Sequence, residues 1–296
     1  MANISKPYEI QYPEITAVVS EDEKRVELIE KFDCIGGAMW AGHHYKKSPV
    51  VENIRIIGDT QRFILKPGKT DLPLEGSYFP AGISGVKVEE NEVAISYRGL
   101  GGGGVGAGIC RASAKGIHRA TSDPSGGGKE AGSTIWLPKR ERVIIGLDDT
   151  DTPTEGATWT LAHNIARAVE DEKSRYLSHT IVQLFPVPYR TKNCVAIACE
   201  FATSDPEGLA CRFEELTREY TLSDETGLAV FKGFDPSPLS EFGWRVKMGE
   251  VTMADLEAVK EHVLIRMNGR GIIGAVAAIP FYTRYHEALE LWSGKD

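Results

Sequence analysis

The chain has 296 residues, of which 42% are hydrophobic and 26% are charged. This composition excludes intrinsically disordered and fibrous proteins, and the length predicts two domains or one large one. There are 42 aspartate and glutamate residues against 34 lysine and arginine residues, so the net charge is −8. The chain therefore lacks the positive field expected of a nucleic-acid-binding protein.

Cysteine usage and hydropathy indicate the cellular compartment. The five cysteines include no CxxC pair, and no signal-like segment opens the chain. The longest apolar run, IIGAVAAIPF, is shorter than the ~20 residues that a membrane helix needs. We therefore expect reduced thiols and a cytoplasmic protein without a membrane segment.

Short strands dominate the predicted first half. Residues 12–19 favour a strand, and the SEDE segment that follows fits a capping box, which predicts a helix over residues 20–32. The IGG segment at 35–37 is expected to end that helix. Residues 50–97 contain short β-branched runs separated by turn signals, which predicts further strands and a hairpin.

Glycine is over-represented, with 31 residues, and two glycine-rich stretches occupy residues 99–108 and 125–132. Two interpretations stay open for this region: a flexible linker, or a backbone-lined cradle for phosphates. The segment SGGGKE does not match the GxxxxGK[ST] pattern of a P-loop. The candidate phosphate contacts here are Gly102, Gly103, Gly104 and Lys129.

The second half alternates strands and helices more regularly. The predicted strands are residues 142–147, 179–185 and 194–201. The predicted helices are residues 158–172, 206–220, 237–248, 252–263 and 283–292. This alternation predicts an α+β (mixed α/β) fold with helices packed on a sheet, divided into domains 1–135 and 136–296.

An acidic motif carries the main chemical signal. Asp148, Asp149 and Asp151 directly follow the predicted strand RVIIGL, and their mutual repulsion requires a compensating cation. Mg²⁺ is the natural candidate, because it prefers hard oxygen ligands and keeps positions for water and phosphate oxygens. In an extended segment Asp149 and Asp151 would point to one side, and Asp148 to the other. An acidic turn in which Asp151 caps a helix is the alternative interpretation.

Gly156 and Thr158 lie just beyond this motif, at the start of a predicted helix. A helix N-terminus presents free N–H groups and a partial positive charge to an anion. A metal-loaded acidic turn beside such a terminus predicts a site for a nucleotide triphosphate. An ordinary N-cap is the alternative role of Thr158.

The segment GLDDTDTPTEGATW resembles the DDTD motif of archaeal tRNA-isoleucine agmatidine synthetase. The segments PYRTKN (188–193) and GRGIIGA (269–275) are similar to two later motifs of that family, in the same order. The resemblance covers about 142–281 and implies a kinase-like domain that uses ATP to activate a cytidine carbonyl by phosphorylation.

The residue roles implied by this resemblance are as follows. Asp148, Asp149 and Asp151 would hold Mg²⁺ and ATP, and Thr158 aligns with a threonine that the family autophosphorylates, although its neighbours differ here. The cationic partners of the phosphates would be Arg190, Lys192 and Arg270. Asn193 and Gly271, from the same two segments, complete the candidate nucleotide contacts.

The chain departs from this family in its remaining parts. The synthetase continues into an OB fold and a zinc ribbon that hold its tRNA, whereas here neither the length nor CxxC pairs for them are present. The net charge of −8 also disfavours tRNA as the substrate. We therefore expect a shared nucleotide-handling core with a different acceptor.

Most of the chain is also similar to methanogenesis marker protein 11 of methanogenic archaea. This resemblance includes SDPSGGGK (122–129), IVQLFPV, TKNCVAI and EYTLSDETGLAVF (219–231). It implies a cytoplasmic role in or near methane metabolism without supplying a reaction. Within the last segment, SDETG (223–227) favours an Asx turn over a metal or substrate contact.

The first functional hypothesis is an Mg²⁺-dependent, ATP-using phosphotransferase or ligase-like enzyme with a small-molecule or protein acceptor. The second is a non-catalytic binding or assembly factor that acts through contacts with other methanogenesis proteins. RNA modification without the usual tRNA-binding domains is a third. A homodimer is an open alternative for the assembly.

Overall fold

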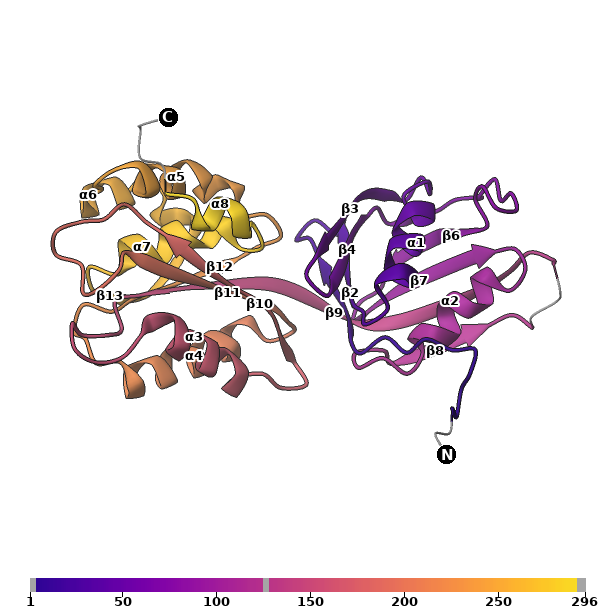
Figure 1. Cartoon of the computed structure of the whole chain (residues 1–296), viewed down its shortest axis with the longest axis horizontal. Helices are drawn as coiled ribbons and strands as arrows, with labels where there is room; N and C mark the ends of the chain where they lie inside the picture. Colours follow the sequence, from indigo (N-terminus) through magenta and orange to yellow (C-terminus); the bar gives the residue numbers. More distant parts are fainter. Residues whose placement is uncertain (1–3, 125–127, 292–296) are drawn as a thin grey trace. The chain divides into compact units, whose positions relative to one another are not determined.

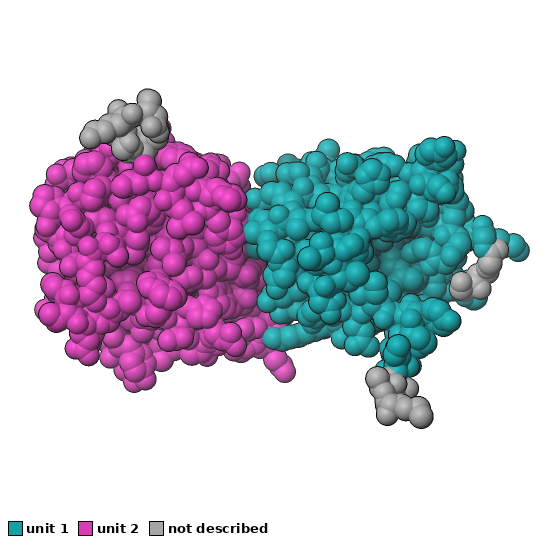
Figure 2. All heavy atoms as spheres, in the orientation of Figure 1, with its two compact units in different colours: residues 1–140 teal, residues 141–296 magenta. Residues whose placement is uncertain are grey.

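The computed structural model describes residues 4–124 and 128–291, and it is a mixed α/β protein, as predicted (Figure 1). The chain divides into two compact units, residues 1–140 and 141–296 (Figure 2). The long strand β9 (Ala131–Asp148) spans this boundary, so that its first part pairs within unit 1 and its last part within unit 2. None of the helices in the described part of the chain has the length and apolar character needed to cross a membrane.

Unit 1 is built on a mixed sheet with strand order β3-β4-β2-β1-β9-β7-β6-β5, and β8 also pairs with β9. Its strands besides β9 are β1 (Ile15–Val19), β2 (Val26–Lys31), β3 (Val51–Ile57), β4 (Thr60–Leu65), β5 (Gly68–Lys69), β6 (Ala81–Val88), β7 (Glu92–Gly99) and β8 (Arg119–Ser122). Its two described helices are α1 (Ile35–Tyr45) and α2 (Gly103–Arg111). Ala41 and Tyr45 of α1 and Ala107 of α2 belong to the core cluster of this unit, so the helices pack on the sheet.

Unit 2 is an antiparallel sheet of order β10-β11-β9-β12-β13 with helices on both faces (Figure 1). Its own strands are β10 (Ser174–Gln183), β11 (Val195–Thr203), β12 (Gly227–Lys232) and β13 (Leu264–Asn268). The described helices are α3 (Thr158–Ala168), α4 (Pro206–Tyr220), α5 (Ser240–Met248), α6 (Met253–Leu256), α7 (Ile272–Ala278) and α8 (Tyr285–Leu289), with single 3₁₀ turns at Ser237–Leu239, Lys260–His262 and Ile279–Phe281.

Successive side chains of β9 point alternately to the two helical layers of unit 2. Val143, Ile145 and Leu147 belong to the core cluster that contains residues of α3 and α4. Ile144 belongs to the cluster that contains residues of α5, α7 and α8. Because successive strand residues face opposite sides of a sheet, a continuous apolar run is required where both faces are covered.

The predicted helix over residues 20–32 is wrong, because the chain forms a hairpin there. Ser20 Oγ donates to Asp22 Oδ1 at 2.7 Å and accepts from the Arg25 N–H at 3.0 Å, which closes a turn between β1 and β2. Such local side-chain hydrogen bonds compete with a helix. Likewise Ile35 begins helix α1, whereas the IGG segment was expected to end a helix.

The flexible-linker interpretation is wrong for the first glycine-rich stretch, because Gly103–Arg111 forms helix α2. Two of its glycines lie directly against β9. A Cβ added to Gly104 would lie 2.1 Å from the carbonyl oxygen of Ala131, and one added to Gly108 would lie 2.4 Å from Cβ of Ser133. These glycines are therefore needed for close packing of a helix on a strand. Ser125, Gly126 and Gly127 of the second stretch lie outside the described residues.

A buried ion pair joins α2 to the sheet of unit 1. Arg111 is 2% exposed and Glu30 is fully buried; the guanidinium donates to both carboxylate oxygens, at 2.5 and 2.7 Å. Tyr12 accepts a further hydrogen bond at 3.2 Å, and the guanidinium lies 4.4 Å from the centre of its ring. The charges are thus fully paired, as burial requires.

We predict that Arg111→Ala lowers the free energy of unfolding by ~3–5 kcal/mol, because it leaves the carboxylate of Glu30 buried without its partner. The double variant Arg111→Met with Glu30→Leu should lose much less, since both charges leave together. Urea denaturation of the three proteins measures this difference. Equal losses in the single and double variants would contradict it.

Candidate functional site

The acidic motif lies at the end of β9 in unit 2. Asp149 adopts a positive φ of 53°, which turns the chain directly after Asp148. The N–H of Asp149 donates to Asp148 Oδ1 at 2.8 Å and so fixes that carboxyl group. As a result Asp148 and Asp149 line the same cavity. The expectation that Asp149 and Asp151 share one side of an extended segment is therefore wrong.

This cavity has a volume of about 90 Å³ and combines an apolar wall with charged groups. The wall includes Leu184, Phe185, Val187, Cys194, Val246, Val251 and Ile273. The charged and polar lining residues are Asp148, Asp149, Arg190, Asn193, Arg270 and Tyr189. Two carboxyl groups and two guanidinium groups thus surround one small apolar recess.

The two carboxyl groups lack full compensation of their charge. Burial raises the pKa of Asp148 well above its usual range, and the neighbouring carboxylate of Asp149 raises it further. Burial also raises the pKa of Asp149, as does Asp151, while Arg270 partly opposes this rise. A bound cation would stabilise the ionised form of both groups.

Arg270 is held beside Asp149 by the SDETG segment. Its backbone N–H donates to Glu225 Oε2 at 2.9 Å, and its Nε lies 3.5 Å from the same oxygen. The guanidinium also lies 5.2 Å from the centre of the Tyr189 ring, a cation–π distance. The Thr226 hydroxyl donates to the carbonyl oxygen of Asp149 at 3.0 Å. SDETG thus supports the acidic turn, a role that its own residue pattern did not reveal.

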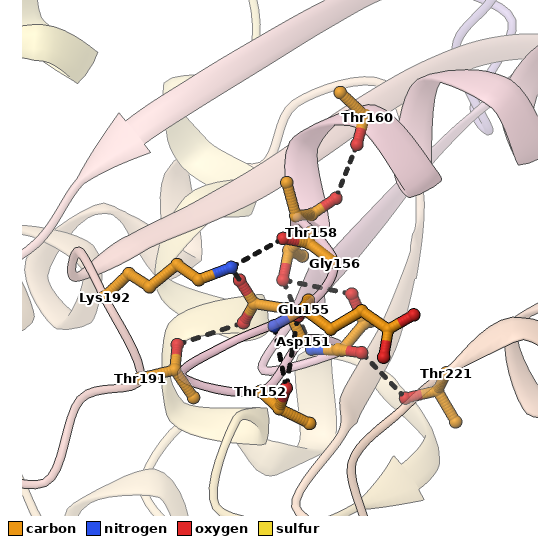
Figure 3. Close-up of polar contacts among 11 residues, drawn as sticks. Asp151, Thr152, Glu155, Gly156, Thr158, Thr160, Thr191, Lys192 and Thr221 are labelled. Carbon is orange, nitrogen blue, oxygen red and sulfur yellow. Dashed lines mark hydrogen bonds and ion pairs between the residues drawn. The ribbon is translucent and has the colours of Figure 1, made fainter.

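Asp151 connects the acidic turn to the segment before β11 (Figure 3). It is 9% exposed and accepts a hydrogen bond from the Thr191 hydroxyl at 3.0 Å. The ammonium of Lys192 lies 3.8 Å from its other oxygen and donates to the carbonyl oxygen of Gly156 at 2.8 Å. The carboxylate of Asp151 therefore holds two loops together instead of lining the cavity.

Thr158 is buried, with 5% exposure, and opens helix α3. Its Oγ1 accepts hydrogen bonds from the N–H of Thr150 at 3.2 Å and from the Thr150 hydroxyl at 3.0 Å. Gly156 adopts a φ of +83°, which favours glycine in the turn before the helix. Together they fix the chain between the acidic motif and α3.

Glycines allow α7 to approach the end of β9. A Cβ added to Gly146 would lie 1.9 Å from the carbonyl oxygen of Ala275, and one on Gly274 would lie 1.9 Å from Asp148 Oδ2. A Cβ on Gly271 would lie 2.7 Å from the carbonyl oxygen of Asp148. The GRGIIGA segment therefore forms one side of the site through its backbone.

The structure gathers most of the predicted site residues in unit 2. Asp148, Asp149, Arg190, Asn193 and Arg270 line the cavity, whereas Asp151, Gly156, Thr158, Lys192 and Gly271 form the turns around it. Gly102, Gly103, Gly104 and Lys129 belong to unit 1, and their contact with phosphate stays a prediction. In the described part of the chain, no group of three or more His, Cys, Asp or Glu side chains is placed to hold a metal ion.

Several residues of the site were not singled out from the sequence. Tyr189 and Thr191 lie within the PYRTKN motif, so the motif could have indicated them. The apolar wall comes from segments more than 50 residues apart, represented by Leu184 and Val246, and no local pattern joins them.

Comparison with known proteins places this chain in a family. The uncharacterized protein MJ0921 of Methanocaldococcus jannaschii is 42% identical over 282 residues, which cover 91% of this chain and 93% of that protein. This chain belongs to the MJ0921 family. A family model described as the TiaS TCKD domain matches residues 144–209, which contain the acidic motif, α3 and β11.

This chain is also similar to TiaS enzymes over part of its length. The tRNA 2-agmatinylcytidine synthetase TiaS of Methanocorpusculum labreanum is 30% identical over 143 residues, 46% of this chain and 34% of that enzyme. TiaS of Methanopyrus kandleri is 30% identical over 148 residues, 46% and 33% of the two chains. The chain therefore spans about a third of the length of these TiaS relatives.

Solved structures of TiaS are also similar to this chain. The crystal structure of TiaS in complex with tRNA and ATP is 25% identical, with a TM-score of 0.43 over 47% of this chain and 36% of that chain. A structure of a tRNA fluorescent labeling enzyme is 25% identical, with a TM-score of 0.42 over the same shares.

We predict that Gly146→Ala lowers the free energy of unfolding by ~1–3 kcal/mol, because the added methyl group meets the backbone of α7. Gly249→Ala is the matched control, since its φ is −172° and no atom lies within 4 Å of the added Cβ. Its effect should stay within about 0.5 kcal/mol. Urea denaturation of both variants tests this, and equal stability of the two would refute the packing role of Gly146.

Proposed function

We propose that this protein is an Mg²⁺-dependent, ATP-binding enzyme that phosphorylates or activates an acceptor. The observation that carries the proposal is the cavity at the end of β9. It places Asp148 and Asp149 together with Arg190 and Arg270. A metal–triphosphate complex needs both kinds of group, carboxylates for the metal and cations for the phosphate oxygens.

The residues present fit Mg²⁺. The partly buried carboxyl groups of Asp148 and Asp149 have raised pKa values because desolvation opposes their ionisation. The carboxylate of Asp149 raises the pKa of Asp148 further, and that of Asp151 raises the pKa of Asp149. One or two carboxylates are the usual protein ligands of Mg²⁺, which otherwise keeps water and phosphate oxygens. When bound, the metal would neutralise charge on the phosphates. Its site would involve Asp148 and Asp149, while Asp151 would keep its contacts with Thr191 and Lys192.

The cationic groups would act on the phosphates by electrostatic stabilisation. Arg270 is already oriented by Glu225 and Tyr189, so it would lose little entropy on binding. The cavity, at about 90 Å³, is smaller than the roughly 300–1,000 Å³ of ordinary ligand pockets, so a nucleotide would lie across its mouth with only a part inside. Thr158 would support the turn, because its buried Oγ1 already accepts two hydrogen bonds from Thr150.

The acceptor is proposed to be a small molecule or a protein. The name of TiaS describes a tRNA-modifying enzyme, but this chain spans only about a third of the TiaS relatives. A net charge of −8 also disfavours a nucleic acid as the acceptor. The resemblance to methanogenesis marker protein 11 stays a prediction, and so does a cytoplasmic role near methane metabolism.

Binding can be tested by the melting temperature of the full chain with ATP and Mg²⁺. A ligand at 100 times its Kd stabilises the folded state by about 2.7 kcal/mol, which should raise the Tm measurably. Asp149→Asn should abolish the rise, as should EDTA. Asp235→Asn is the control, because Asp235 is exposed and its Oδ1, which accepts from the Ser237 N–H, is kept in asparagine. The proposal would be refuted if millimolar nucleotide does not raise the Tm, or if the Asp149→Asn variant shows the same rise.

The second candidate function is a non-catalytic assembly factor. Helix α1 of unit 1 exposes large apolar side chains: Ile35 is 70% exposed, Met39 55% and Trp40 48%. Such groups in proximity favour a protein contact. In pull-downs from a methanogen lysate, a partner bound by the wild type and lost with Met39→Ser/Trp40→Ser would support this function if no ATP turnover occurs. ATP turnover by the purified chain, with no such partner, would exclude it.

A further inference from the structure

A second cavity lies in unit 1, over the face of the sheet opposite to its helices. Tyr97 belongs to the core on the helix side, and the Ser133 hydroxyl donates to the carbonyl oxygen of Gly104 in α2 at 2.5 Å. Ser96 and Thr134 are each adjacent in sequence to one of these residues and therefore face the other way. Both line the cavity, whose volume is about 750 Å³, within the roughly 300–1,000 Å³ typical of small-molecule sites.

Hydroxyl groups form the floor of this cavity. Ser96 on β7 and Thr134 on β9 are directly opposite each other, and their hydroxyl oxygens are 2.9 Å apart. Thr121 on β8 is opposite Thr134 on the other side, and Gly85 on β6 is opposite Ser96. The floor is therefore a row of hydroxyl groups across β8, β9 and β7. The row ends at Gly85 on β6, which has no side chain. Each hydroxyl can both donate and accept a hydrogen bond.

Charged residues of both signs stand along the sides. Arg98 is about half exposed, and its NH1 lies 3.7 Å from Asp123 and 4.0 Å from Glu130. Both distances exceed a direct hydrogen bond of about 2.7–3.2 Å, so the guanidinium retains donors for a ligand. Lys69 and Asp71 line the opposite side, at β5 and just beyond it. Among the residues that the structure describes, the Lys69 ammonium has no ion-pair partner.

This lining discriminates between classes of ligand. The lining contains three carboxylates, those of Asp71, Asp123 and Glu130, and only two cations. Its net negative charge would repel a polyanion. A polycation would be repelled by the positive charges of Lys69 and Arg98. An apolar ligand would leave the hydroxyl row and the charges without partners, which costs free energy. A ligand with many hydroxyl groups offers both donors and acceptors, which matches every group on the floor and the sides.

We propose that this cavity of unit 1 binds a polyhydroxylated, uncharged small molecule of the sugar class, through the hydroxyl row of Ser96, Thr134 and Thr121 and the side chains of Arg98 and Asp123. The site stands on the geometry of unit 1 and does not depend on the nucleotide site of unit 2.

Titration calorimetry of the full chain with D-ribose, D-glucose, D-galactose and myo-inositol tests this assignment. At least one of these probes should bind, and Arg98→Ala and Thr134→Val should each weaken that binding by roughly tenfold, since each removes a hydrogen-bonding group. Two controls separate the sites. Lys24→Ala, at an exposed lysine paired with Asp22, should bind like the wild type, and so should Asp149→Asn, which disables only the proposed nucleotide site.

The proposal would be overturned if none of the four probes binds, or if binding survives both Arg98→Ala and Thr134→Val. Loss of sugar binding in Asp149→Asn would place the ligand in unit 2 and also overturn it. Binding of inorganic phosphate or spermidine in place of the sugars, sensitive to Arg98→Ala, would contradict the ligand class. Arg98 is exposed, so its variant is expected to fold, and an unchanged melting temperature checks this.

Discussion

The close approach of α7 to the end of β9 is the constraint on which the candidate site depends. Gly146 and Gly274 leave no room for a Cβ between the strand, the helix and the carboxyl group of Asp148. Because the backbones touch there, Asp148 is partly buried, and Arg270, which precedes the helix, is brought beside Asp149. In both units, therefore, glycines allow a helix to pack closely against β9. Gly104 and Gly108 do this for α2 in unit 1.

The buried ion pair of unit 1 and the partly buried acidic pair of unit 2 show opposite electrostatic states. Arg111 and Glu30 in unit 1 satisfy each other through two hydrogen bonds, so this pair has a structural role. Asp148 and Asp149 in unit 2 repel each other, and burial raises the pKa of both. Folding tolerates such an arrangement where a ligand relieves it, which is why perturbed groups beside a cavity favour a functional interpretation. The contrast explains why the proposed chemistry is placed in unit 2.

This member of the MJ0921 family combines two sheets that share the strand β9, and each sheet carries a different kind of recess. The recess of unit 2 is small, partly apolar and charged, whereas the cavity of unit 1 is larger and lined by hydroxyls. Similarity to TiaS covers residues 144–209 in the family model, within unit 2. The proposed division of labour follows: unit 2 would handle the nucleotide, and unit 1 would carry what distinguishes this family.

The sequence by itself determined the elements whose signals are local. The apolar run of β9, the amphipathic helix α4 and the acidic motif after β9 were all predicted from spacing and chemistry. Tertiary structure decided the rest. Local hydrogen bonds of Ser20 close the turn before β2, and the strand then places Glu27 and Glu30 beside buried cationic partners, Arg62 and Arg111, far along the chain. The cavity walls likewise come from segments that are distant in the sequence, which no local pattern encodes.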